Sequence, residues 1–204
     1  MVIDLYYCPY QCFRSDFNSN PKKTTKSEVD LINNMRMLWE QHGAWTRMAI
    51  SSIVFGSPDE EFVINRLLQN PADFANTLKF FYGDKTALKF SDLLRSHLVI
   101  AAQIVKASKA GDTKSALEAE KKWYENADEI ASFLNFINPY WSEESWKVML
   151  YEHLALVKAE AVDMLTKDYE AGIKVYDKIE SQALGMADMM TEGIIKQFPY
   201  KFTK

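Results

Sequence analysis

Three histidines are the residues of this chain whose type and spacing could support chemistry. His42, His97 and His153 each lie near the middle of a stretch with helical periodicity, at a position where the pattern calls for an apolar residue. Because packed helices of similar length tend to align their middles, we expect the three rings to share one layer of a bundle. Neutral imidazole is the commonest metal ligand, and three imidazoles leave a position open on zinc or another divalent ion. The sequence therefore predicts a divalent metal or small-ligand site in the bundle core.

Four further residues are secondary candidates for this site. Glu160 follows His153 by two turns on the same face, roughly 10 Å along the helix axis. At that distance we expect Glu160 to orient a partner or to pair with a cation such as Arg47, not to bind the same ion. Tyr176 and Glu180 lie on a candidate apolar seam of the last helix, which would place a second polar cluster in the core.

The alternative is that each histidine is a separate core residue bonded to a carboxylate, a hydroxyl or a carbonyl. The known motifs do not decide, because the sequence has no Glu-x-x-His, His-x-x-x-His or His-Glu-x-x-His pattern. It also lacks a Gly-x-Ser-x-Gly elbow and a glycine-rich phosphate loop, so no catalytic residue is predicted. The competing hypothesis for function is a structural or protein-interaction module with an inert core.

The two cysteines form a third, less favoured candidate. Cys8 and Cys12 are spaced as CxxxC, and two thiols cannot complete a zinc site unless distant histidines join them. We expect ordinary reduced cysteines, since a redox role would require a strongly lowered thiol pKa.

The elements that position these residues can be read from capping residues, prolines and glycines. Ser27 is the expected N-cap of the first long helix, and the run from Asn70 to Asp73 is expected to open a short one. The expected helices cover residues 28–55, 58–68, 71–82, 85–109, 113–137, 143–167 and 169–198. No segment alternates as a strand does. The sequence predicts an all-α fold, an antiparallel bundle of about five long helices and two short connecting helices.

Residues 1–26 lack helical periodicity and are expected to form a tail or linker, residues 27–199 the bundle domain, and residues 200–204 a second tail. With 48% hydrophobic and 13% aromatic residues, the chain can bury a substantial core. The net charge of -4 predicts no nucleic-acid partner. No apolar run of about 18 residues and no secretory signal pattern occur, so we expect a cytoplasmic protein without a membrane span, with homo-oligomerisation left open.

Several stretches carry a resemblance to known proteins. They are LWEQHGAWTR (38–47), NPADFANTLKFFYGDK (70–85), HLVIAAQIVKASKAGD (97–112), KKWYENADEIASFLNFINPYW (121–141), YEHLALVKAEAV (151–162) and MADMMTEGIIKQFP (186–199). From Met37 to Pro199 the chain resembles a family of small bacterial helical proteins of unassigned function, whose members are often labelled acetylglutamate kinase. Amino-acid kinases are larger α/β proteins with glycine-rich phosphate loops, so that label does not fit this sequence. The resemblance implies a compact helical domain and supplies no catalytic residues.

Overall fold

The computed structural model describes residues 24–203, and the expectations for Cys8, Cys12 and the N-terminal tail up to residue 23 lie outside them. The elements are α1 (Lys26–Phe55), α2 (Glu60–Leu67), α3 (Asn70–Lys109), α4 (Thr113–Ile137), α5 (Glu143–Thr166), α6 (Tyr169–Gln197) and a single 3-10 turn, η1 (Pro199–Lys201). Within the described residues there is no strand. The prediction of an all-α bundle is confirmed.

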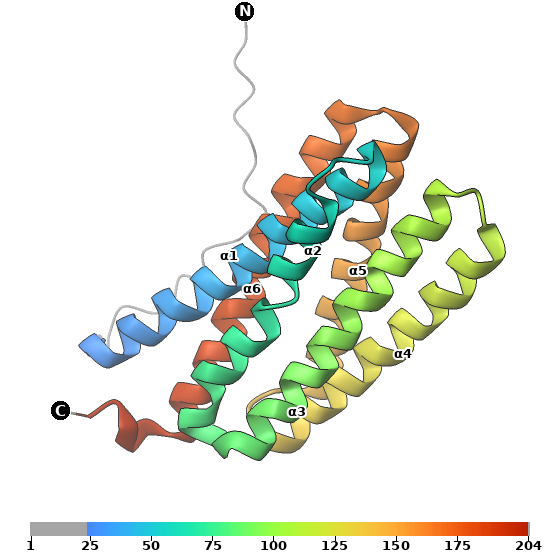
Figure 1. Cartoon of the computed structure of the whole chain (residues 1–204). Helices are drawn as coiled ribbons and strands as arrows, with labels where there is room; N and C mark the ends of the chain where they lie inside the picture. The colour runs from blue at the N-terminus through green and yellow to red at the C-terminus, as the bar shows by residue number, and fades with distance from the viewer. Residues whose placement is uncertain (1–23, 204) are drawn as a thin grey trace, which may run out of the picture.

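Helix α3 consists of two limbs joined at Gly83. This glycine has φ 77° and ψ 165°, a left-handed φ that other residues rarely adopt, so the backbone leaves the helical conformation there. The chain turns back on itself at this point, and the two limbs of α3 run in opposite directions (Figure 1). The limbs correspond to the expected short and long helices on either side of residue 83. Counted in this way, the described chain has the predicted five long and two short helices.

Helix α1 begins slightly earlier than predicted. Its N-cap is Thr25 and not Ser27, because Thr25 forms a capping box in which its hydroxyl accepts from the Glu28 N–H and the Glu28 carboxylate accepts from the Thr25 N–H. Asp112 and Ser142 cap α4 and α5. The bundle therefore starts at residue 25 or 26.

The long helices form a closed arrangement around one core. Helix α1 packs against α6, α6 against α5, α5 against α4, α4 against α3, and α3 again against α1. Helices α1, α5 and the second limb of α3 run in one direction, and α4, α6 and the first limb of α3 run in the other (Figure 1). None of the helices in the described part of the chain is long and apolar enough to cross a membrane.

The C-terminal end of the chain packs on the bundle. Phe202, inside the expected tail of residues 200–204, is buried and stacks on Phe81 with ring centroids 6.0 Å apart. Near the same end, Trp141 and Trp146 are fully buried and meet edge to face, at the start of α5. These aromatic contacts close the end of the bundle at which the first limb of α3 turns into the second.

Candidate functional site

The three histidines meet in the core of the bundle. His42 on α1, His97 on the second limb of α3 and His153 on α5 are only 2%, 3% and 3% exposed. The rings of His42 and His153 have centroids 5.8 Å apart. All three histidines line one small cavity of about 10 Å³, whose other walls are apolar or aromatic: Trp39, Phe90, Leu94, Ile130, Leu134, Trp146 and Leu150. The structure thus brings together the three residues that the sequence predicted to share a layer.

Each imidazole is held by a side-chain amide from the neighbouring helix. The clearest case is His97, whose Nδ1 lies 2.9 Å from Asn126 Oδ1 on α4. The amide nitrogen of Asn126 donates in turn to the carbonyl oxygen of Leu93, at 3.2 Å. Leu93 stands four residues before His97, so the amide bridges the ring and the backbone of the helix that carries it.

The same hydrogen-bond arrangement occurs at the other two histidines. His42 Nδ1 lies 3.2 Å from Asn70 Oδ1, and His153 Nδ1 lies 3.2 Å from Gln182 Oε1. The two amide nitrogens donate to the carbonyl oxygens of Leu38 and Met149, which again stand four residues before the histidine. We call Asn70, Asn126 and Gln182 the clamp amides.

The clamp amides fix the tautomer of the rings. Each amide nitrogen is committed to a carbonyl oxygen, which can only accept, so the amide oxygen is the atom that faces the imidazole. Nδ1 must then carry the proton and donate it to that oxygen, which leaves Nε2 with its lone pair free. Among the described residues, every hydrogen bond of the three rings uses Nδ1.

The three clamped histidines are one motif repeated along the chain. The histidines stand 55 and 56 residues apart, and the clamp amides are spaced by 56 residues. The spacing extends to the layers next to the rings: Trp39, Leu94 and Leu150 precede the histidines by three residues, and Met35, Phe90 and Trp146 precede them by seven. All six of these side chains are buried. We infer from this spacing that three related helical hairpins pack around a pseudo-threefold axis, which the three histidines face.

Burial keeps the rings neutral. Desolvation lowers the pKa of His42 to about 4, against a smaller opposing effect of its bond to Asn70. Desolvation, and then the proximity of His42, lowers the pKa of His97 to about 3, and desolvation followed by the proximity of His42 and His97 lowers that of His153 to about 3. At neutral pH no proton has to leave for a ligand to bind at Nε2.

One pair of rings, His42 and His153, approaches the spacing that a shared metal ion requires. As the side chains stand, no group of three or more His, Cys, Asp or Glu residues in the described part of the chain is arranged to hold an ion. Two imidazoles on one tetrahedral ion with bonds of 2.0–2.1 Å would have ring centroids roughly 5 Å apart. The 5.8 Å between His42 and His153 exceeds this by less than about 1 Å. A cavity of about 10 Å³ has room for roughly one water molecule or one ion.

The secondary candidates form a separate cluster between α1, α5 and α6. Glu160 is buried and pairs with Arg47, as expected from the sequence. The Arg47 guanidinium also lies 4.7 Å from the centre of the half-buried Tyr176 ring. Burial raises the pKa of Glu160, and the charge of Arg47 opposes that rise. This cluster stabilises the packing of three helices and contributes no group to the histidine cavity.

Glu180 does not lie on the buried seam, and that expectation is wrong. The buried face of α6 runs through Ile179, Gln182, Ala183 and Met186, which leaves Glu180 exposed at its flank. There its carboxyl group lies beside that of Glu40, whose pKa is raised first by desolvation and then by Glu180.

The clamp amides are the candidate site residues that the sequence does not predict. Asn70 was expected to help open the short helix after residue 70, whereas its side chain is fully buried against His42. Asn126 and Gln182 lie inside helices and match no motif. The signal that identifies them is an amide residue 28 or 29 positions after each histidine.

Comparisons of the chain with models of protein families, with curated proteins and with solved structures found no match.

Proposed function

We propose that this protein binds one divalent metal ion, zinc being the best candidate, on the pseudo-threefold axis through Nε2 of His42, His97 and His153. The observation that carries the proposal is the clamp on each ring, which directs the proton to Nδ1 and leaves an Nε2 lone pair free on each of three rings that line one ion-sized cavity. Histidines that bind metals nearly always donate their other N–H to an oxygen acceptor in this way.

The clamps favour a metal over three unrelated core histidines. A buried acceptor that lacks a hydrogen bond costs about 1–3 kcal/mol, and none of the three Nε2 atoms has a hydrogen bond within the described residues, although the unpaired indole N–H groups of Trp39 and Trp146 line the same cavity. A structural histidine would gain from bonds at both nitrogens. A single cation bound between the rings would satisfy all three acceptors together.

The surroundings suit binding more than turnover. Three neutral ligands leave the full charge of a divalent ion uncompensated, and such an ion polarises a fourth ligand or lowers the pKa of bound water. The walls of the cavity are apolar, and Glu160, the nearest buried carboxylate in sequence, is already paired with Arg47. Among the described residues no carboxylate lines the histidine cavity to act as a general base, so we propose a binding or carrier role in a cytoplasmic bacterial protein.

Elemental analysis of purified protein tests the proposal. We expect about one zinc per chain after dialysis against zinc and then against buffer, and loss of the metal in each of the variants His42→Ala, His97→Ala and His153→Ala. Added zinc at about 100 times its Kd should raise the free energy of unfolding by about 2.7 kcal/mol. A metal-free protein whose stability does not respond to zinc would favour the inert-core module instead.

A further inference from the structure

A second and much larger cavity lies next to the histidine layer. It has a volume of about 440 Å³ and is lined by side chains from α1 to α5. Pockets for small molecules generally measure about 300–1,000 Å³, so this one is large enough for a ligand. We call it the axial chamber.

The axial chamber continues along the pseudo-threefold axis. Thr46, Ala101 and Val157, which follow the three histidines by four residues each, all line it, and so do the three residues one turn further on, Ile50, Val105 and Ala161. Four residues of helix correspond to about 6 Å, so the chamber begins one turn beyond the rings. It lies on the side of the C-terminal ends of α1, α3 and α5, at the top of Figure 1.

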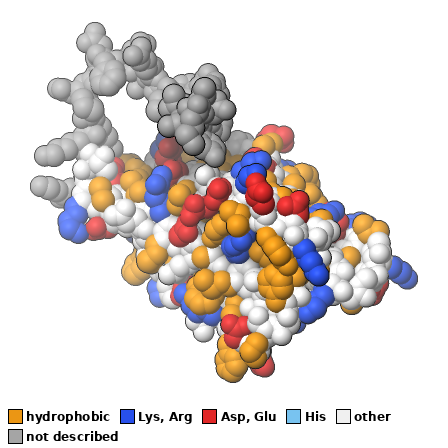
Figure 2. Space-filling view, turned by 90° about the horizontal axis from the view of Figure 1, so that it is seen from above, with side chains coloured by type: hydrophobic (Ala, Val, Ile, Leu, Met, Phe, Trp, Pro, Cys, Tyr) orange, Lys and Arg blue, Asp and Glu red, His pale blue; other side chains and the backbone are white. Residues whose placement is uncertain are grey.

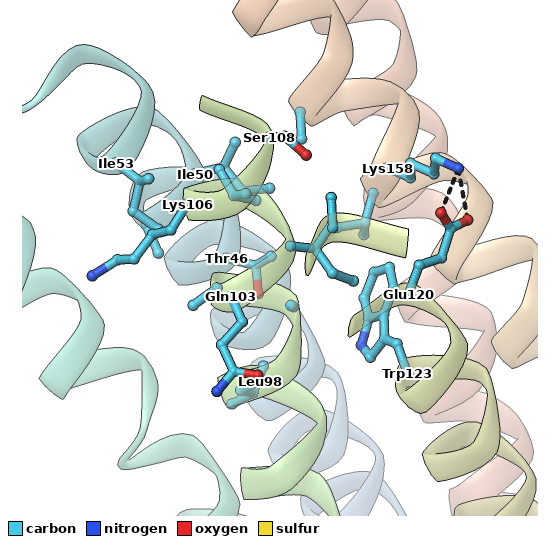
Figure 3. Close-up of a pocket in the computed structure, with 18 of the residues that line it drawn as sticks. Thr46, Ile50, Ile53, Leu98, Gln103, Lys106, Ser108, Glu120, Trp123 and Lys158 are labelled. Atoms are coloured by element: carbon cyan, nitrogen blue, oxygen red, sulfur yellow. Dashed lines mark hydrogen bonds and ion pairs between the residues drawn. The ribbon is translucent and has the colours of Figure 1, made fainter. Parts of the chain in front are cut away.

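The floor of the axial chamber holds two buried donors without partners. Most of the lining is apolar, but Thr46 Oγ1 and Trp123 Nε1 are buried and have no hydrogen-bond partner. The two side chains are 8% and 3% exposed, and Figure 3 shows both among the residues around the chamber. The Trp123 ring also lies 5.2 Å from the His97 ring, at the histidine end. Buried donors of this kind require an acceptor.

The mouth of the chamber is apolar and electrically neutral. Lys106 pairs with Glu60 at 2.8 Å, and Lys158 pairs with Glu120 at 2.6 Å. The charges of both lysines that line the chamber are therefore compensated by carboxylates of the protein. Val99, Leu117 and Val162 line the chamber and are exposed. Figure 2, which looks down on the upper end of Figure 1, shows apolar side chains exposed among charged ones.

We propose that the axial chamber binds a neutral molecule with an apolar chain and one carbonyl group, a medium-chain ketone, aldehyde or ester. The carbonyl oxygen accepts hydrogen bonds from Thr46 Oγ1 and Trp123 Nε1, and the chain runs along the apolar wall towards the mouth. Both free groups can donate and the tryptophan can only donate, which selects an acceptor. The site does not depend on the metal, because no histidine lines it.

Displacement of the apolar dye N-phenyl-1-naphthylamine by 2-undecanone tests this proposal. We expect the ketone to displace the dye, and Thr46→Val and Trp123→Phe each to weaken ketone binding about 3- to 10-fold, the value of one net hydrogen bond. Undecanoate at pH 8 should bind at least about 10-fold more weakly than the ketone, since a buried carboxylate without a cation is unfavourable. Metal-free protein should give the same results.

Two controls separate ligand recognition from stability. Thr191→Val and Trp141→Phe remove a hydroxyl and an indole N–H that are bonded within the protein and lie outside the chamber, so ketone affinity should not change. Thr46→Val should leave the melting temperature of the free protein equal or higher, because it removes an unpaired buried hydroxyl. The proposal is overturned if the ketone fails to displace the dye, whether or not the cause is a dimer that covers the mouth of the chamber. It is also overturned if neither Thr46→Val nor Trp123→Phe weakens ketone binding, or if undecanoate binds as well as the ketone.

Discussion

Lowering the pH should destabilise the metal-free protein through its three histidines. In the native state His42 keeps a pKa of about 4 and the other two about 3, whereas an unfolded chain has histidine pKa values near 6.5. Below pH 6.5 the unfolded state therefore binds more protons than the native state. The contribution to stability is fully present above pH 6.5 and is lost as the pH falls from 6.5 towards 4.

The size of the effect follows from linkage. At pH 5 each histidine that stays neutral in the native state lowers the unfolding free energy by about 2 kcal/mol relative to pH 8, and the three together lower it by about 6 kcal/mol. A domain of this kind has a total unfolding free energy of about 5–15 kcal/mol, so a loss of about 6 kcal/mol removes at least about 40% of it near pH 5. Glu40 and Glu160 oppose the trend, because their pKa values are raised and their native forms take up protons more readily.

Urea titrations followed by circular dichroism at pH 8, 7, 6 and 5, on protein freed of metal with a chelator, measure this dependence. A His97→Gln variant isolates one ring from the carboxylates. Between pH 6 and pH 5 the unfolding free energy of the variant should fall less steeply than that of the wild type. The two slopes should differ by at most about 1.4 kcal/mol per pH unit, the value for one proton. Equal slopes for the variant and the wild type would refute the reasoning, since they would mean that His97 is charged in the native core.

Other predictions concern the clamps and the helix contacts. Replacing the clamp amide Asn126 with Leu should weaken zinc binding about 10- to 100-fold, while Asn135→Ala on the same helix should not; equal zinc affinities in competition with a chromophoric chelator would count against a role for the clamp. Gly193→Ala should destabilise the fold by about 1–3 kcal/mol in urea titration, because its Cβ would overlap the Trp141 indole. Gly43→Ala, with nothing within 4 Å of its Cβ, should stabilise the helix by about 0.5–1 kcal/mol, and a loss of stability there would show that the space beside His42 is needed.

Sequence patterns were enough to predict the elements and the histidine layer. Local signals mark the helix ends, such as Gly83 between the limbs of α3, and apolar periodicity placed His42, His97 and His153 inside. The misplacement of Glu180 shows the limit of periodicity, because the buried stripe of α6 is set by which neighbours α6 packs against.

The clamps and the axial chamber depend on tertiary contacts and could not be read from local patterns. Asn70 sits where a helix-opening residue is expected, and its true partner is 28 positions away on another helix. The repeat is hidden because few of its positions other than the histidines keep the same residue type, although most keep their burial. The axial chamber is lined by residues from five helices, so no single segment encodes it.

The most direct test of the metal centre is a titration of cobalt(II) into the metal-free protein, followed by visible absorption. Cobalt(II) replaces zinc in such sites, and its visible bands are intense when it has four ligands and weak in water. We predict intense bands that saturate at a single equivalent and that disappear in His97→Ala. Weak bands like those of the free ion, or an unchanged spectrum in His97→Ala, would contradict the proposal that the three clamped histidines bind a metal.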